Sequence, residues 1–342
     1  MLLLLIVVEG SNYSITFPLE RIEQPNLGRR SLNSVTNNRI QLMAKDDYTY
    51  SAFVKVGNLK HKLVVDTGSS VLWLSKASLL QRPNIKKIDQ IISIQYVVAQ
   101  VKLQMAEMTV ALGNMIAEMN VGIATSIKNM PSAIGGILGL GPPTHSSASV
   151  LQTMNIRNFS LFLSKEGVNE RGWLTINNAQ PSNYKGRFTF EPLSSVPATR
   201  WASNGHSIIV GGQEIRFPSP TPILFDSGKS LMSLDNSTAK QIARLVQGVF
   251  IPNTDFYKVS CWYQKNGPPI SFKMSTGHIY TLQSSSYIVK IHSEIGCVLG
   301  FDITSEGHGF FTLGNLFLRE FVSIFDVANN RIGFAPADHH LQ

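Results

Sequence analysis

The chain has 342 residues, of which 43% are hydrophobic and 15% are charged. This composition is typical of a packed globular protein and excludes a disordered one. The length exceeds what one hydrophobic core usually organises, so two lobes are expected. The formal net charge is +8 at pH 7, but the basic residues are scattered. They form neither a stripe nor a known nucleic-acid-binding module, so no nucleic-acid partner is expected.

Residues 1–8 form an apolar run with the length of a short signal peptide, which Glu9 ends. No basic segment precedes this run, so the signal is imperfect or truncated. A polar, basic stretch follows at residues 18–45 and contains Arg29-Arg30. No later apolar run is long enough to span a membrane, so no stable membrane anchor is expected. A leader of this kind predicts a secreted or vacuolar location.

Short strands are predicted from residue 48 onward. Residues 48–56 alternate between apolar and polar side chains, Gly57-Asn58 makes a turn, and residues 63–65 form an apolar strand. This strand runs directly into Asp66, which is followed by the small residues Thr67-Gly68-Ser69-Ser70. A single Asp-Thr-Gly is more often an ordinary turn between strands than a catalytic site.

A second turn of the same kind makes the catalytic interpretation stronger. Residues 223–225 are apolar and lead into Asp226-Ser227-Gly228 in the second half of the chain. Two carboxyls a few ångströms apart cannot both ionise cheaply, so one of them keeps its proton. The charged member can deprotonate a water while the neutral one hydrogen-bonds a substrate carbonyl. The pair therefore predicts hydrolysis without a metal, a cofactor or a covalent intermediate.

Four further elements are predicted around the two turns. A hairpin enters at residues 92–96 and leaves at residues 100–105, and residues 134–141 form an apolar strand whose glycines allow close backbone approach. The best helix is expected at residues 237–250, with Asp235, Asn236 or Ser237 as its cap. A helix of one or two turns is expected at residues 316–321.

Together these motifs resemble those of the pepsin-like aspartic endopeptidases, of the secreted fungal type. The resemblance covers residues 48–337 and includes both Asp turns, Trp73 and the segment 137–141. Its most specific part is the closing run 325–336, Phe-Asp-Val-Ala-Asn-Asn-Arg-Ile-Gly-Phe-Ala-Pro. It implies an all-β, bilobal pepsin-like fold of two similar β-barrel lobes with the active-site cleft between them.

The resemblance also implies a division of the chain. Residues 1–45 would be a leader and a propeptide that covers the cleft until it is removed, although a frayed extension is the alternative for the basic stretch. Residues 46–183 would form the amino-terminal lobe with Asp66 and the flap, a hairpin that closes over bound peptide. Residues 184–342 would form the carboxy-terminal lobe with Asp226. The expected protein is a monomer that takes extended peptide segments of protein substrates.

The family's site roles fall on the following residues. Asp66 and Asp226 would be catalytic, with Ser69 supporting the outer oxygen of Asp66. Thr67, Ser227, Gly68 and Gly228 would complete the two turns, and Tyr96 would be the flap tyrosine that hydrogen-bonds Trp73. Cys261 and Cys297 would form a disulfide, the alternative being two buried thiols. The sequons at Asn12, Asn158 and Asn236 would be glycosylation sites in a secreted chain.

Two departures from the family pattern keep a second function open. Lys229 stands where the family has Thr or Ser; pointing inward, its charge would favour a doubly ionised pair, and pointing to solvent, it would cost one hydroxyl contact. The flap lacks the usual glycines, since Val97-Val98-Ala99-Gln100 follow Tyr96. The alternative is therefore a catalytically weak or inactive pepsin-like protein that binds peptides or proteins in the cleft. Asn315, where the family usually has Asp, is a milder change.

Overall fold

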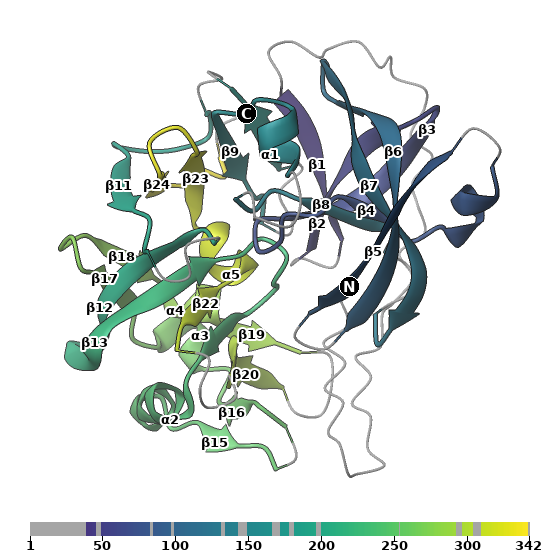
Figure 1. Cartoon of the computed structure of the whole chain (residues 1–342). Helices are drawn as coiled ribbons and strands as arrows, with labels where there is room; N and C mark the ends of the chain where they lie inside the picture. The colour runs from purple at the N-terminus through teal and green to yellow at the C-terminus, as the bar shows by residue number, and fades with distance from the viewer. Residues whose placement is uncertain are drawn as a thin grey trace.

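A computed structural model describes residues 39–45, 49–82, 85–96, 99–130, 134–142, 149–165, 172–177, 181–195, 200–252, 254–291, 296–303 and 309–340. The predicted leader, most of the basic stretch with Arg29-Arg30, the sequon at Asn12 and the flap-tip residues Val97 and Val98 lie outside these ranges. The described part is built mainly of strands, which confirms the all-β prediction (Figure 1).

The strands of the first half, within the described ranges, are β1 (Arg39–Lys45), β2 (Thr49–Val56), β3 (Leu59–Asp66), β4 (Trp73–Leu74), β5 (Lys86–Gln95), β6 (Gln100–Leu112), β7 (Met115–Lys128), β8 (Gly136–Gly139), β9 (Asn158–Phe162) and β10 (Trp173–Ile176). A 3-10 helix, η1 (Ala77–Gln81), and one short α-helix, α1 (Val150–Thr153), accompany them.

The strands of the second half are β11 (Thr189–Pro192), β12 (Ala202–Val210), β13 (Gln213–Phe225), β14 (Met232–Leu234), β15 (Val249–Phe250), β16 (Tyr257–Val259), β17 (Ile270–Met274), β18 (Ile279–Leu282), β19 (Ile288–Lys290), β20 (Cys297–Leu299), β21 (Phe301–Ile303), β22 (Phe311–Leu313), β23 (Phe321–Asp326) and β24 (Arg331–Pro336). The helices among them are α2 (Asn236–Leu245), α3 (Tyr263–Asn266), α4 (Ser284–Tyr287) and α5 (Asn315–Leu318).

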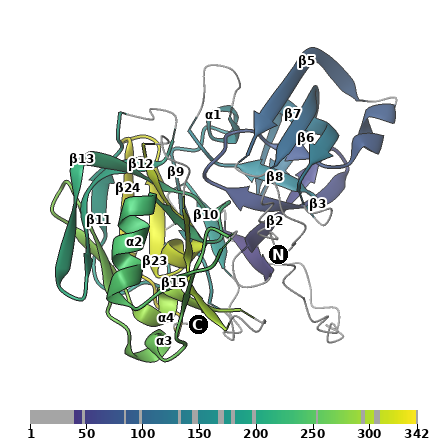
Figure 2. The ribbon, with the colours of Figure 1, turned by 90° about the horizontal axis from the view of Figure 1, so that it is seen from below.

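These strands form three sheets that build two lobes. A 13-stranded sheet has the order β11-β24-β23-β9-β10-β1-β2-β3-β8-β4-β7-β6-β5, a 7-stranded sheet the order β18-β17-β12-β13-β22-β14-β21, and a 4-stranded sheet the order β15-β16-β20-β19. Figure 2 shows β3, β5, β6 and β7 gathered on one side and β12, β13 and α2 on the other. The two-lobed prediction is confirmed.

The strand β1 is an inner member of the large sheet, although its residues end the segment expected to be leader and propeptide. It pairs with β2 through Leu42↔Ala52 and with β10 through Ile40↔Leu174, both antiparallel. The Leu42 side chain is fully buried in the main core. This strand therefore contributes to the packing of the sheet as well as to its hydrogen bonding.

A cluster of aromatic rings packs where segments from both halves of the chain meet. Phe159 of β9 stacks on Phe325 of β23 with ring centroids 4.7 Å apart, and Trp201 lies edge-on to both rings. All three side chains are almost completely buried. Aromatic pairs of this kind add stability beyond the area that they bury, so the cluster anchors the segment that leads from Trp201 into β12.

The helix predicted at residues 237–250 begins close to the expected position but ends earlier, at Leu245. Asp235 is its cap, since its carboxylate accepts the Thr238 N–H at 3.0 Å. Gln247 adopts a positive φ of 53°, and the Gly248 N–H returns to the Ala243 carbonyl at 2.7 Å. This left-handed residue ends the helix, and Val249 and Phe250 pair with β16 as the strand β15. The predicted carboxyl end was therefore wrong.

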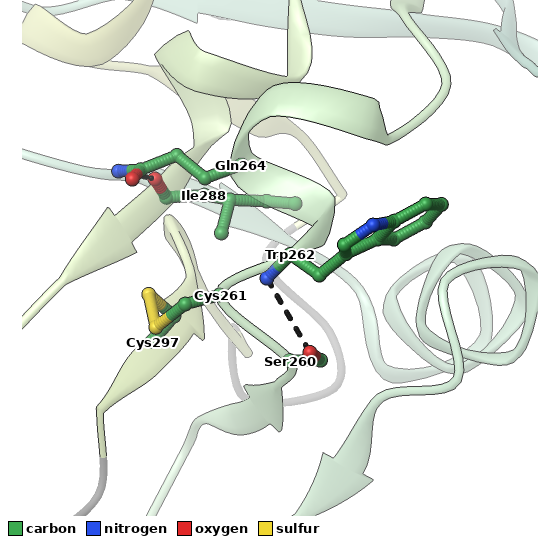
Figure 3. The surroundings of a disulfide bond; sticks show 6 residues. All are labelled: Ser260, Cys261, Trp262, Gln264, Ile288 and Cys297. Carbon is green, nitrogen blue, oxygen red and sulfur yellow. Dashed lines mark hydrogen bonds between the residues drawn. A yellow bond between two sulfur atoms is a disulfide. The ribbon is translucent and has the colours of Figure 1, made fainter.

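The disulfide predicted between Cys261 and Cys297 is present (Figure 3). It joins the loop before α3 to β20 and spans a sequence separation of 36 residues. Beside it, the Gln264 amide donates to the Ile288 carbonyl at 3.0 Å, which ties α3 to β19. A crosslink over a loop of this length stabilises a fold by about 3–4 kcal/mol in chain-entropy terms.

Candidate active site

The first Asp turn is held by a strand that passes beneath it. β3 and β8 pair in parallel, so that Asp66 lies opposite Gly139. The Leu140 N–H donates to the Asp66 carbonyl at 2.7 Å. A Cβ at Gly139 would lie 2.6 Å from the backbone nitrogen of Val71, so the glycine is what lets the strand approach the turn this closely.

The second Asp turn repeats this arrangement in the other lobe. β13 and β22 also pair in parallel, with Phe225 opposite Leu313, and the Asp226 N–H donates to the Leu313 carbonyl at 3.1 Å. A Cβ at Gly314 would lie 2.2 Å from the Leu231 carbonyl oxygen. The predicted strand at residues 134–141 therefore lies next to the first turn, and β22 with Gly314 takes the same place next to the second turn.

Thr67 and Ser227 fasten the two turns to each other. The Thr67 hydroxyl donates to the Phe225 carbonyl and the Ser227 hydroxyl to the Val65 carbonyl, each at 2.8 Å. The two hydroxyl oxygens also accept the opposite turn's backbone N–H, from Ser227 at 2.9 Å and from Thr67 at 3.1 Å. All these groups are buried, so breaking one bond would leave an unsatisfied polar group and cost about 1–3 kcal/mol.

The two carboxyls lie against each other between the turns. Asp66 accepts the Gly68 N–H at 2.7 Å and Asp226 accepts the Gly228 N–H at 2.8 Å. A Cβ at Gly68 would lie 2.4 Å from the carboxyl carbon of Asp226, and a Cβ at Gly228 would lie 2.4 Å from Oδ1 of Asp66. Each glycine therefore faces the opposite carboxyl, and any side chain at either position would displace it.

Burial and mutual repulsion favour a shared proton at this pair. Asp66 is only 4% exposed, whereas Asp226 is half-buried and borders solvent. Burial first, and then the charge of Asp226, raise the pKa of Asp66 to about 7, against the hydrogen bonds from Ser69 and Gly68 that lower it. Because the two carboxyls also hydrogen-bond each other, the raised pKa belongs to the pair. One proton is thus retained well above the ordinary range of an aspartate.

Tyr96 connects the flap hairpin to the first carboxyl. The Trp73 ring N–H donates to the Tyr96 hydroxyl at 2.9 Å, and the Tyr96 hydroxyl also hydrogen-bonds Ser69. The Ser69 hydroxyl in turn donates to Oδ2 of Asp66 at 2.5 Å. Burial raises the pKa of Tyr96, so the phenol stays neutral. The structure therefore joins the expected pair of Tyr96 and Trp73 to the expected pair of Ser69 and Asp66.

Lys229 adopts neither of the two orientations considered from the sequence. Its ammonium pairs with Oδ2 of Asp302 at 2.7 Å, and the side chain is only 16% exposed. The Ser233 hydroxyl donates to the other oxygen of Asp302. Asp255 lies in the same group of charges, because burial and then the charge of Asp302 raise its pKa while Lys229 lowers it. The lysine charge is thus compensated by Asp302, on the opposite lobe from Asp66.

Sequence reasoning missed three residues that border the two turns. Besides Asp302, the Trp201 ring N–H donates to the Leu140 carbonyl at 2.8 Å, and the Arg200 guanidinium donates to the Gly68 carbonyl. Asn315, noted only as a substitution, donates its amide to the Ser227 carbonyl at 2.9 Å. Asp302, Trp201 and Arg200 carry no local motif, since each reaches the site from a distant segment, and no sequence signal pointed to them.

Two further findings concern the chain outside the pair of carboxyls. Within the described ranges, no three His, Cys, Asp or Glu side chains cluster closely enough to hold a metal ion. None of the helices in these ranges has the length and apolar character required to cross a membrane.

Comparison with known proteins gives a consistent picture. The family model for eukaryotic aspartyl protease matches residues 49–337. Renin of Rattus norvegicus is 26% identical over 308 residues (81% of this chain, 76% of renin), and pepsin A of Gallus gallus is 26% identical over 325 residues (85% and 84%). Vacuolar protease A of Aspergillus fumigatus is 25% identical over 352 residues (92% and 86%). The crystal structure of an aspartic proteinase from Irpex lacteus has the same fold, with a TM-score of 0.75, 22% identity, and coverage of 88% of this chain and 97% of that one.

Proposed function

Because this chain belongs to the eukaryotic aspartyl protease family, we propose that it is an endopeptidase that hydrolyses peptide bonds in proteins at acidic pH. The observation that carries the proposal is the pair of carboxyls, Asp66 and Asp226, which share a hydrogen bond, together with the raised pKa of Asp66. An extended peptide segment lies between the two lobes and beneath the flap that carries Tyr96. The catalytic step needs neither a metal nor a cofactor.

The proposed reaction uses the two carboxyls in different protonation states. The ionised carboxyl takes a proton from a water, which attacks the scissile carbonyl carbon. The protonated carboxyl donates to the carbonyl oxygen and stabilises the tetrahedral oxyanion. A proton then passes to the leaving nitrogen, and the C–N bond breaks. Ser69 orients Asp66 during these steps, while Thr67 and Ser227 keep the two carboxyls in register.

The pairing of Lys229 with Asp302 supports activity over the inactive alternative. An uncompensated ammonium about 4 Å from a carboxylate would favour ionisation by about 4 kcal/mol at an effective dielectric near 20. Such a charge would remove the proton that the acid step requires. With Nζ held 2.7 Å from Asp302, the lysine leaves that proton in place.

One specific observation favours a second function, which is peptide binding without efficient cleavage. The outer oxygen of Asp66 accepts the Ser69 hydroxyl, whereas Lys229 occupies the corresponding position beside Asp226 and directs its ammonium to Asp302. Among the residues that the structure describes, none therefore gives Asp226 the hydroxyl contact that Asp66 has. The loss of one such bond is worth about 1 kcal/mol, which predicts a slower enzyme and not an inert one.

Several further features belong to the same proposal. Residues 1–45 are a leader and a propeptide, the chain is secreted or vacuolar, and the mature protein is a monomer with lobes at residues 46–183 and 184–342. The propeptide is basic, so it is attracted to the carboxyls that it covers. Acid protonates these carboxyls and weakens the attraction, which suits a propeptide that is removed in acid.

The decisive experiment is acid exposure of the full chain followed by incubation with an unfolded protein from about pH 2.5 to pH 7, a range that brackets the ordinary and the raised carboxyl pKa. We expect cleavage in the parent and none in Asp66→Asn or Asp226→Asn, which keep the volume but remove the titrating group. A folded, disulfide-intact parent that cleaves nothing at any pH would refute the peptidase and favour the binding protein.

A further inference from the structure

One cationic side chain beside the catalytic turns has no part in the proposed mechanism. Arg200 belongs to the carboxy-terminal half of the chain, yet its guanidinium donates to the backbone carbonyl of Gly68 in the first turn. Gly68 lies directly against the carboxyl of Asp226, as the 2.4 Å approach of a Cβ at that position indicates. The guanidinium therefore binds a residue that itself lies against one of the two carboxyls.

The backbone that follows Arg200 is held in position by hydrogen bonds. The next residue, Trp201, is buried, donates its ring N–H to the Leu140 carbonyl, and accepts the Phe225 N–H at 2.9 Å. The Arg200 carbonyl accepts the Ala202 N–H at 2.9 Å. Because this backbone is already fixed, less conformational freedom is lost when the guanidinium binds a ligand, which favours recognition.

The charge of Arg200 is not neutralised by a carboxylate within the part of the chain that the structure describes. Two other cationic side chains are paired with carboxylates. Lys229 binds Asp302, and Arg331 binds Asp326 at 2.8 Å. Arg200 is exposed, and its bond to Gly68 uses one of the five N–H donors of a guanidinium. The remaining donors form a planar fork that matches a carboxylate in both charge and geometry.

We propose that Arg200 determines specificity by binding a carboxylate of the substrate, on the side of the scissile bond that lies against Gly68. The carboxylate is either an acidic side chain or the substrate's own carboxyl terminus, since both offer the same two oxygens. The inference rests on the proposed function, because a peptide must occupy the space between the lobes. It adds a substrate class, acidic peptides, to that function.

The test compares matched peptides on the acid-exposed full chain. A capped peptide carries Glu at successive positions on either side of the cleaved bond, and each is paired with its Gln counterpart; a third series carries Gln and a free C-terminal carboxylate. At about pH 6, where Glu is ionised, we expect a preference in kcat/KM of about tenfold or more for the carboxylate at one position. At about pH 3 the preference should vanish, because the carboxylate is protonated.

Two variants separate recognition from a structural role. Arg200→Gln should bring the Glu-to-Gln ratio close to one, and Arg200→Lys should retain only part of it, because an ammonium cannot form the planar fork. Arg216→Gln, which removes an exposed arginine paired with Glu214, should leave the ratio as in the parent. A merely structural Arg200 would slow the Glu and Gln peptides equally, and that result would overturn the inference.

A binding measurement keeps the inference testable if no peptide is cleaved. Fluorescence anisotropy of the labelled Glu and Gln peptides with the parent chain then reports recognition alone. Tighter binding of the Glu peptide, lost in Arg200→Gln, would support Arg200 while the proposed function fails. Equal binding of the two peptides would refute the inference whether or not the chain is a peptidase.

Discussion

At the residue scale, the surroundings of the two Asp carboxyls depend on Asp302, a side chain that lies far from them in the sequence. Lys229 is three residues beyond Asp226, and its backbone N–H donates to the Asp226 carbonyl at 3.2 Å. Its ammonium nevertheless leaves the site, because Asp302 binds it from β21. The substitution at position 229 is therefore tolerable only while Asp302 binds the ammonium.

We expect Asp302→Asn to move the alkaline limb of the pH–activity profile to lower pH. Without its partner, the Lys229 ammonium favours the doubly ionised pair, which has lost the acid needed for catalysis. The profile of kcat/KM against pH measures the shift. The double variant with Lys229→Met should return the limb toward its original position, since the charge itself is gone. An unchanged limb in Asp302→Asn would mean that the freed lysine does not approach the carboxyls.

At the element scale, the closing hairpin β23–β24 shows why the last sequence motif is so specific. Asp326 ends β23 and accepts the backbone and amide N–H groups of Asn329 and the Nε–H of Arg331. Asn330 adopts a positive φ of 49°, which asparagine tolerates better than most residues. Both strands are inner members of the large sheet, so the turn must keep them in register.

Asp326 should contribute stability that is lost in acid. Burial raises its pKa, but the hydrogen bonds from Asn329 and Arg331 and the charge of Arg331 outweigh burial, so the pKa lies below its ordinary value. A depressed folded-state pKa stabilises the fold above the ordinary aspartate pKa of about 3.9 and loses that contribution as pH falls through the folded-state pKa.

We therefore expect Asp326→Asn to lower the free energy of unfolding by about 1–3 kcal/mol near neutral pH and by progressively less as the solution becomes more acidic. Urea titrations at a series of pH values measure the difference. Asp89→Asn, at an exposed position of β5, is the matched control. A deficit that stayed constant down to the most acidic condition would contradict the electrostatic explanation.

At the scale of the whole molecule, bringing the two carboxyls together lowers the stability of the folded state. The two lobes are joined through the buried bonds of Thr67 and Ser227, which also bring the carboxyls of Asp66 and Asp226 together. Burial and repulsion then raise the pKa of Asp66 to about 7, whereas in the unfolded chain it has its ordinary value of about 3.9. The folded state therefore holds a proton that the unfolded state releases.

The sign of this difference predicts a pH dependence of stability. Between about pH 4 and pH 7, unfolding releases a proton, so rising pH favours unfolding and the parent loses stability across this window. Asp66→Asn removes the titrating group, so we expect a flatter curve and a more stable protein than the parent near neutral pH. The two proteins should converge below about pH 4. Thermal unfolding of both across this range measures the effect, and parallel curves would contradict it.

What the sequence determined by itself was the local chemistry of this protein. The two Asp turns and the apolar-apolar-Gly strand at residues 134–141 are short patterns whose backbone requirements are set by neighbouring residues. The resemblance to a family added the pairing of Trp73 with Tyr96 and of Cys261 with Cys297. The tertiary structure alone decided the surroundings of these groups. Asp302 and Arg200 reach the turns from other segments, and α2 ends early because its following residues pair with β16. The physical reason is that charge pairing and strand pairing act across space, between residues whose positions along the chain carry no common signal.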